Sequence, residues 1–204
     1  MSSARDQILS RVQAALKPLP QRAALPDWDR ELIRMRNLQA ASDQWTLFAE
    51  RLKAVNGTPL TSVAELVALM EKNKWLRGYC DPVLWPRFKD AFPAGITVET
   101  VFDRTRIDDY AFGITAATGA IAETGTIILT DKDTSRRLGA LAPWLHVAVV
   151  TRATIFPDIT AAVAALPNDP NIIWVTGPSK TADVEGILIE GVHGPGVQVA
   201  LLFD

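Results

Sequence analysis

The amino-acid sequence predicts an α/β protein, a three-layer α/β/α sandwich on a mostly parallel sheet with a helical arm at its N-terminus. Apolar residues at helical spacing dominate the beginning of the 204-residue chain, whereas short helix-like and strand-like segments alternate from about Thr58 onwards. The runs VAVV (147–150) and IIWV (172–175) are apolar at consecutive positions, which is typical of strands buried on both faces. We therefore expect a helical arm over residues 1–55 and an α/β domain over residues 56–204.

The arm is expected to contain two helices. The first has an apolar stripe over residues 8–16, with either Ser2 or Ser3 as its N-cap and a proline just after it. The second is expected to run from about residue 27 to 52, again with an apolar stripe. Stripes of this kind must pack against something. The sequence does not decide whether they pack against the α/β domain, against a second copy of the chain in a homo-oligomer, or against another protein.

The α/β part divides into alternating segments in chain order. Helices are expected over residues 62–70, 82–92, 136–141 and 159–166, with a short helical turn over 181–185. Strands are expected over residues 75–80, 96–102, 112–122, 126–130, 146–151, 172–176 and 197–203. Ser62 followed by Glu65 is a capping-box pattern, and Pro82 suits the first turn of the next helix.

Composition and charge exclude several classes of protein. The 21 Lys and Arg side chains oppose 23 Asp and Glu without any dense basic region, so nucleic acid is not an expected partner. The longest stretch without a charged side chain, 138–151, is shorter than the ~20 residues that span a bilayer, so we expect no membrane segment. The N-terminus lacks the apolar core of a secretory signal, which makes the cytoplasm the expected compartment.

The few cysteines and histidines also limit the chemistry. Cys80 is the only cysteine, so no intrachain disulfide can form, and this chain alone has too few thiolates for an iron–sulfur cluster. His146 and His193 lie far apart in the sequence, and no His/Cys metal motif is present. We therefore expect neither a metal nor a cofactor in this chain, and we interpret His146, at the start of a strand, as structural.

The first candidate for chemistry is Glu123, in the segment AETGT (122–126). It follows thirteen uncharged residues (110–122) and precedes a β-prone apolar run. Desolvation there would raise the pKa of its carboxyl group, which suits a general base, a protonated donor or a nucleophile. The alternative is a structural carboxylate at a strand end, hydrogen-bonded by neighbouring hydroxyls and amides.

The second candidate is the loop TGPSKTAD (176–183), between a predicted strand and the predicted helical turn. A glycine loop that leads into a helix presents backbone N–H groups, and Ser179, Lys180 and Thr181 add donors and a positive charge. This pattern predicts a site for a carboxylate or phosphate, although the Walker A spacing is absent. The alternative is a capped helix start that binds nothing, with Ser179 or Thr181 as N-cap and Asp183 in the first turn.

The third candidate is the turn GVHGPG (191–196), just before the last predicted strand. Three glycines and a proline impose an unusual backbone path and place His193 on a loop, where it could donate to an oxyanion or shuttle a proton. The alternative is a turn histidine that bonds to backbone. Serine hydrolase chemistry is not expected, because no Gly-x-Ser-x-Gly motif is present.

Three segments, taken together and in order, resemble the lactate-utilisation protein C family, the LUD domain. They are AIAETGTIIL, SRRLGALAPWLHVAVV and GPSKTADVEGILIEGVHGPGVQVALL. The similarity is close from about Gly113 to the C-terminus and looser over residues 27–95. The residues that fall on the family pattern are Glu123, Thr124, Gly125, Ser179, Thr181, Asp183, His193 and Gly194. The family pattern also includes the segment with Arg136 and Arg137, either of which could pair with a carboxylate.

The resemblance implies a Rossmann-like fold similar to the sugar-isomerase and CoA-transferase group, in agreement with the periodicity. It also implies a role in oxidising L-lactate to pyruvate as one of three proteins, of which the other two would carry iron–sulfur clusters. We therefore expect a cluster-free, non-redox subunit with iron–sulfur partner proteins and a pocket for a small carboxylate.

The expected pocket has Glu123 and His193 as its catalytic residues. Its ligand-binding residues are expected to be Thr124, Gly125, Arg136, Arg137, Gly177, Ser179, Lys180, Thr181, Asp183 and Gly194. We expect these segments to meet near the C-terminal ends of the parallel strands, where open α/β sheets bind ligands. Two alternatives remain: a stand-alone enzyme of CoA-transferase or isomerase type that uses Glu123, and a structural assembly subunit with a vestigial pocket.

Overall fold

The structure, a computed structural model, describes residues 3–17, 43–131, 137–166, 169, 171–182 and 187–204. The chain divides into two compact units, residues 1–36 and residues 37–204. The first contributes one described helix, α1 (Ala4–Leu16), and the second contains all the other described elements. None of the described helices combines the length and the apolar character needed to cross a membrane.

Helix α1 forms as the sequence predicts. Ser3 is its N-cap and completes a capping box with Asp6, whose amide donates to the serine hydroxyl at 3.2 Å. The helix buries none of its residues. Its apolar stripe remains exposed, with Ile8 61%, Leu9 45% and Val12 49% accessible to solvent.

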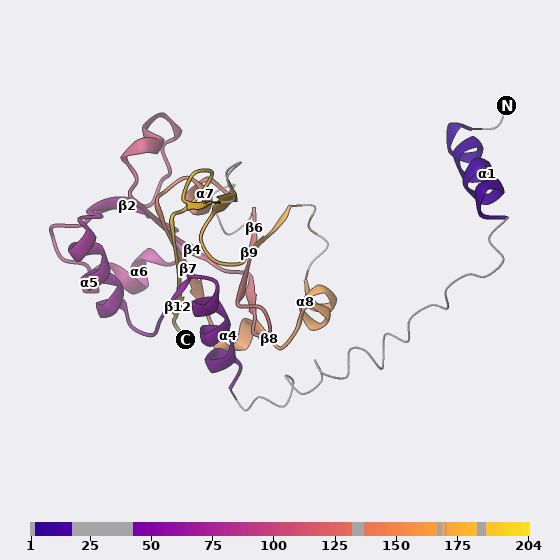
Figure 1. Ribbon diagram of the computed structural model, residues 1–204. Helices are drawn as coiled ribbons and strands as arrows, with labels where there is room; N and C mark the ends of the chain where they lie inside the picture. The colour runs from indigo at the N-terminus through magenta and orange to yellow at the C-terminus, as the bar shows by residue number, and fades with distance from the viewer. Residues whose placement is uncertain (1–2, 18–42, 132–136, 167–168, 170, 183–186) are drawn as a thin grey trace. The chain divides into compact units, whose positions relative to one another are not determined.

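The second unit is built on a sheet of six parallel strands in the order β1-β12-β7-β4-β2-β3 (Figure 1). These strands are β1 (Thr58–Leu60), β2 (Arg77–Cys80), β3 (Thr97–Glu99), β4 (Phe112–Ala116), β7 (Leu145–Val150) and β12 (Val197–Leu202). The central strands β4, β7 and β12 are buried at nearly every position, because both faces of the sheet are covered. The predicted α/β class with a mostly parallel sheet is confirmed.

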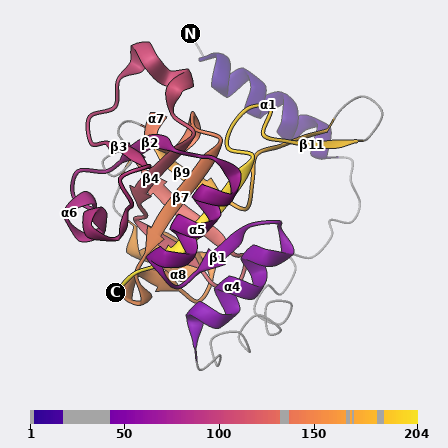
Figure 2. The same ribbon diagram turned by 90° about the vertical axis from the view of Figure 1, so that its left-hand side faces the viewer.

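One face of the large sheet is covered by helices α5 (Val63–Asn73) and α6 (Trp85–Phe88), the latter followed by the 3-10 turn η1 (Lys89–Ala91) (Figure 2). Helix α5 begins at the capping box of Ser62 and Glu65 that the sequence predicts. The side chains packed between these helices and the sheet have no exposed surface; among them are Leu66, Met70, Phe88, Phe112, Ile114, Val147 and Val199.

The opposite face packs against α4 (Gln44–Ala54), α7 (Leu138–Leu141) and a second sheet that the sequence does not predict. The second sheet has the order β8-β5-β6-β9 and consists of β5 (Gly119–Ile121), β6 (Thr126–Thr130), β8 (Ile155–Phe156) and β9 (Ile172–Val175). Helix α8 (Ile159–Ala165) covers its outer side, where Ala162 packs with Ile121 and Ile128 (Figure 1). The 3-10 turns η2 (Arg104–Asp109) and η3 (Arg152–Thr154) complete the unit.

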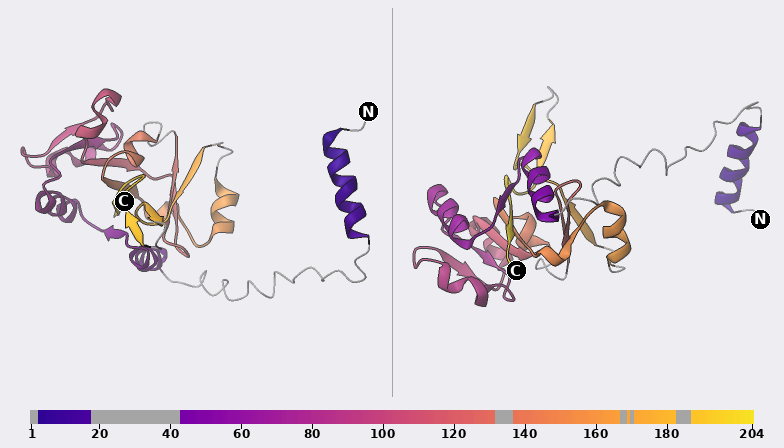
Figure 3. Two further views of the ribbon diagram at one scale, coloured as in Figure 1. Left: turned by 45° about the horizontal axis from the view of Figure 1, so that its top comes forward. Right: turned by 90° about the horizontal axis from the view of Figure 1, so that it is seen from below.

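A separate antiparallel ribbon, β10 (Lys180–Ala182) and β11 (Leu188–Glu190), extends from the body of the unit (Figure 3). The helical turn predicted over 181–185 is therefore wrong at its start, while residues 183–186 lie outside the described residues. Thr181 is β-branched and pairs with Ile189 across the ribbon, and this ladder overrides the local helix-start signal.

Helix α4 belongs to the core of the α/β unit and not to an N-terminal arm. Trp45 is 7% exposed, and Phe48 and Leu52 have no exposed surface, because all three face the two sheets. Asp43 caps the helix by accepting from the amide of Trp45 at 3.2 Å. Residues 27–42 of the predicted second helix lie outside the described residues. The boundary predicted at residues 55/56 thus differs from the division at 36/37.

Two predicted strands also differ from the structure. The run 112–122 is two strands, because the amide of Ala117 donates to Val149 in the large sheet and that of Thr118 donates to Ile128 in the small one. The chain crosses between sheets there. The run IIWV is an antiparallel edge strand, β9, in which Trp174 is 40% exposed; consecutive apolar residues did not mean burial on both faces.

The core position of α4 predicts a large effect of truncating Phe48. Phe48→Ala should lower the free energy of unfolding by about 3–5 kcal/mol, because it removes a fully buried ring. Ile8→Ala on the exposed stripe of α1 should change it by about 0.5 kcal/mol or less. Urea denaturation measures both, and equal small effects would contradict the packing of α4 against the sheets.

Candidate functional site

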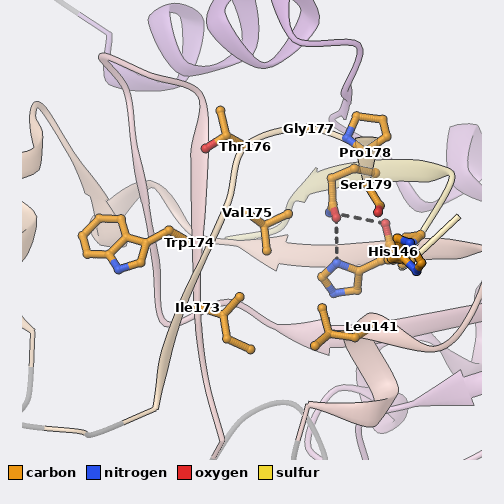
Figure 4. A pocket seen from close by; sticks show the side chains of 14 residues that line it. Leu141, His146, Ile173, Trp174, Val175, Thr176, Gly177, Pro178 and Ser179 are labelled. Atoms are coloured by element: carbon orange, nitrogen blue, oxygen red, sulfur yellow. Dashed lines mark hydrogen bonds between the residues drawn. The ribbon is translucent and has the colours of Figure 1, made fainter. Parts of the chain in front are cut away.

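A cavity of about 270 Å³ opens beside the first residues of β7 and β12 (Figure 4). Its lining consists of Ala140, Leu141, His146, Ile173, Trp174, Val175, Thr176, Gly177, Pro178, Ser179, His193, Gly194, Pro195 and Gln198. His146 and Gln198 are the second residues of their strands, so the cavity lies at the N-terminal end of the parallel sheet. The predicted position at the C-terminal ends is wrong. There, Arg152 pairs with Asp43 and Asp204 at 3.1 and 3.2 Å.

The floor of the cavity is formed by His146 and Gln198, which belong to a row of buried polar side chains on one face of the large sheet. His146 stands between Thr115 of β4 and Gln198 of β12, and each of the three is at most 1% exposed. Nε2 of His146 lies 2.9 Å from the Thr115 hydroxyl, and Nδ1 lies 2.9 Å from Oε1 of Gln198. In-register pairing of His146 with Gln198 across β7 and β12 makes this row possible.

Hydrogen bonding sets the tautomer of His146, and burial sets its charge. The Gln198 amide nitrogen donates to the carbonyl oxygens of Val199 at 3.0 Å and His146 at 3.4 Å, so Oε1 faces the ring. Because Oε1 only accepts, Nδ1 carries the proton and Nε2 accepts from the Thr115 hydroxyl. Burial lowers the pKa of the imidazole to about 4, against a partial opposing effect of Gln198. The ring is therefore neutral at physiological pH.

The wall opposite His146 joins two of the predicted loops (Figure 4). The amide of Ser179 donates to Pro195 and the amide of Gly191 donates to Ser179, both at 2.9 Å. A Cβ atom on Gly194 would lie 3.1 Å from Ser179, so these backbones are in close contact. Within the described part of the chain, neither the Ser179 hydroxyl nor the His193 imidazole has a hydrogen-bond partner. Both are therefore available to a ligand.

Lys180 and Thr181, predicted as anion ligands, lie outside this lining. The ammonium group of Lys180 donates to the Val55 carbonyl at 3.2 Å and pairs with Glu190 at 3.6 Å. It thus supplies a positive charge at the C-terminal end of α4, where such charges are favourable. Thr181 is a ribbon residue of β10. Asp183 lies outside the described residues.

Glu123, Thr124 and Gly125 form the tight turn between β5 and β6 and do not line the cavity. Gly125 has φ of +67°, and a Cβ atom there would overlap the backbone nitrogen of Leu52 in α4. The amide of Glu123 donates to the Pro157 carbonyl at 3.1 Å. The turn is therefore a packing element, and Gly125 is required by its close contact with α4.

A chain of three hydroxyl groups connects this turn to the cavity. Thr124 lies 2.7 Å from Thr126, which lies 2.8 Å from Thr176 between the hydroxyl oxygens. Thr176 lines the cavity, but its hydroxyl is engaged with Thr126. The three hydroxyl groups thus connect the turn of Glu123 to the 176–179 segment. Of the two segments predicted to share a cleft, 176–179 lines the cavity and Glu123 does not.

Arg137 is also separate from the cavity. It has φ of +73° at the start of α7, and its Nε lies 2.6 Å from Oδ1 of Asp131. This salt bridge connects the two ends of the segment 131–137. Arg136 lies outside the described residues.

Sequence reasoning brought Gly177, Ser179, His193 and Gly194 together correctly and missed the polar floor. Thr115, His146 and Gln198 each interrupt a run of apolar residues in a central strand. Buried polar groups require hydrogen-bond partners, so single polar residues in neighbouring buried strands are the signal that could have paired them. His146 lies in strand β7, as the sequence predicts, and it also lines the cavity.

The remaining ionisable candidate is Cys80, on the other face of the sheet. It has no exposed surface, and burial, with the nearby Asp81 charge, raises the pKa of its thiol to about 12. Among the described residues, no three His, Cys, Asp or Glu side chains come together as a metal site would require.

Comparison with known proteins identifies the family of this chain. The profile of the LUD domain matches residues 67–202, about two thirds of the chain. The chain belongs to the LUD domain family. The match includes both cavity loops and the strands β4, β7 and β12 that supply the polar floor.

Curated relatives of this LUD domain chain include proteins named lactate utilization protein C. That of Bacillus licheniformis is 36% identical over 98 residues, which cover 44% of this chain and 41% of the relative. That of Deinococcus radiodurans is 38% identical over 87 residues, 40% of this chain and 41% of the relative. The matched part therefore spans about two fifths of the length of these relatives.

A solved structure supports the fold. The crystal structure of a DUF162 family protein from Deinococcus radiodurans superposes with a TM-score of 0.55 at 24% sequence identity. The superposition covers 83% of this chain and 98% of that one.

Burial of neutral His146 predicts acid sensitivity. The unfolded chain binds a proton on this ring below about pH 6.5, whereas the folded protein does so only below about pH 4. The free energy of unfolding should therefore fall as pH falls from 7.5 to 4.5, by about 2–3 kcal/mol from this group. Urea titrations at the two pH values measure it.

The matched variants for that experiment are His146→Gln and His193→Gln. The first should lose about 2–3 kcal/mol of the pH-dependent difference in unfolding free energy, because the group that titrates is gone. The second should retain it, because His193 is exposed on its loop. If His146→Gln showed the same fall in stability as the wild type, burial of a neutral His146 would be wrong.

Proposed function

We propose that this chain is a component of a lactate-utilisation system and that its cavity binds a small carboxylate such as lactate or pyruvate. The names of the curated relatives support the system to which it belongs. The composition of the cavity wall supports the class of ligand. Electron transfer would take place in iron–sulfur partner proteins of the assembly, with this chain as a non-redox subunit in the cytoplasm.

The single observation that carries the proposed ligand is a pair of polar groups in the cavity wall, the Ser179 hydroxyl and the His193 imidazole, that have no hydrogen-bond partner among the described residues. The hydroxyl of Ser179 can donate to a carboxylate, and His193 can do so from a ring nitrogen. Leu141, Ile173 and Val175 supply an apolar surface for the methyl group of a three-carbon acid (Figure 4). At about 270 Å³ the cavity lies just below the roughly 300–1,000 Å³ typical of drug-sized ligands.

The polar floor would position the ligand without adding charge. Neutral His146 is held by two hydrogen bonds, which use both of its ring nitrogens. It neither repels nor neutralises a bound anion, and its ring presents a fixed surface below Ser179. Among the described residues of the lining, His193 is then the side chain that can present a positive charge to the ligand.

Isothermal titration calorimetry with pyruvate and L-lactate tests this function. Ser179→Ala should weaken binding by roughly 1–3 kcal/mol, about 5–150-fold, because it removes a hydrogen bond to a charged group. Lys180→Ala is the matched control and should bind as the wild type does, since Lys180 is engaged with Val55 and Glu190.

Two results would contradict the proposal. A loss of affinity in Lys180→Ala but not in Ser179→Ala would place the anion on the outer side of the loop. The absence of binding to either acid by the wild-type chain would favour a structural subunit with a vestigial pocket.

A further inference from the structure

A second, larger hollow of about 480 Å³ lies on the other side of the glycine-rich turn 191–196. It is lined by segments from η2 and its end, from α7 and β7, and from the turn itself. Leu141, His193 and Gly194 line both this hollow and the smaller cavity, so they form the wall between the two. The volume falls within the range of small-molecule sites.

Trp144 is the largest side chain in this hollow, and two glycines hold it in place. A Cβ atom on Gly191 or on Gly196 would overlap the six-membered ring of the indole. The turn therefore packs its backbone directly against Trp144, which explains two of the three glycines in GVHGPG. Despite these close contacts, the Trp144 side chain remains 48% exposed. A rigidly held indole with an open surface inside a hollow is a stacking platform.

The wall beside Trp144 is also firmly held. Tyr110 is 3% exposed; its hydroxyl donates to Glu99 at 2.9 Å and accepts from the Asp103 amide at 3.0 Å. Arg106 bridges Glu99 and Asp103 at 2.7 and 3.0 Å, which fixes the η2 segment. The hollow is thus preformed on this side, as small-molecule sites usually are.

The charges of the lining narrow the class of ligand. The carboxylate of Asp108, exposed on η2, accepts hydrogen bonds from N–H donors, and the described residues of the lining include no lysine or arginine. The Asp108 carboxylate would repel a phosphate placed beside it. The lining therefore favours a ring that carries no negative charge and offers N–H groups at its edge.

We propose that this hollow binds an uncharged planar heteroaromatic ring with N–H donors, of the purine or flavin kind. The ring stacks on Trp144 and directs its donor edge to Asp108. Any phosphate or sugar attached to it extends into solvent. This site shares Leu141, His193 and Gly194 with the carboxylate cavity, but the proposal rests on Trp144 and Asp108, which line only this hollow, and so does not depend on the function proposed above.

Riboflavin and guanosine are the probes, because both rings carry N–H donors and neither carries a charge. Riboflavin binding is followed by quenching of flavin fluorescence on stacking, and guanosine binding by calorimetry. At least one of the two should bind saturably to the wild-type chain.

Trp144→Ala should weaken binding at least about tenfold, the scale of aromatic stacking on a ring. Trp144→Phe should retain most of it, which separates loss of stacking from loss of folding. Asp108→Asn keeps the shape but removes the charge, and should weaken binding about tenfold or more. Trp174→Ala is the matched control, since Trp174 is 40% exposed but lines the other cavity. It should bind as the wild type does.

Four results would overturn the proposal. The first three are the failure of both probes to bind up to their solubility limits, unchanged affinity in Trp144→Ala, and an equal loss of affinity in Trp174→Ala. The fourth is protection of the Trp144 side chain from solvent only on addition of a protein partner, because the indole would then be a protein contact. Pyruvate titration of the same variants tests the carboxylate cavity separately.

Discussion

The second unit depends on the contact between two glycine turns and the C-terminal end of α4. A Cβ atom on Gly125 would overlap the backbone nitrogen of Leu52, and one on Gly177, with φ of +83°, would overlap the carbonyl oxygen of Val55. The β5–β6 turn and the segment after β9 therefore meet the helix backbone to backbone. Side chains could adjust to a neighbour, but backbone atoms cannot. This contact sets where the small sheet lies against the large one, and so where the wall of the carboxylate cavity begins.

The large sheet contributes a row of buried polar side chains beside the carboxylate cavity. Isolated polar groups in such a place would cost stability, but Thr115, His146 and Gln198 satisfy one another across three neighbouring strands. Burial keeps the imidazole neutral, and the shared hydrogen bonds keep its ring fixed. The cavity thus has a rigid, uncharged floor and a wall whose Ser179 and His193 are free toward a ligand within the described residues. The groups that can bind an anion thus lie on the loops, and the strands hold these loops in position.

The sequence predicts the α/β class well because apolar runs and capping boxes such as that of Ser62 and Glu65 are local signals. It also brings together the loops of Ser179 and His193, which meet because β9 belongs to the small sheet, where it runs antiparallel to β6, and not to the parallel sheet of β12. It fails for Glu123 and Lys180, whose surroundings are set by α4, a helix more than sixty residues away in the sequence. Local composition indicated desolvation around Glu123 and a free cation at Lys180. Packing instead placed the first in a turn and paired the second with Val55 and Glu190.

The unfolding free energies of Gly125→Ala and Gly177→Ala test the central claim most directly. Each alanine adds a Cβ atom against fixed backbone at a positive φ, so each should lower stability by about 2–4 kcal/mol. Gly95→Ala is the control, because no atom lies within 4 Å of its added Cβ, and it should change stability by about 0.5 kcal/mol or less. If all three variants unfolded at the same urea concentration as the wild type, the backbone contact with α4 could not be what positions the small sheet and the cavity wall.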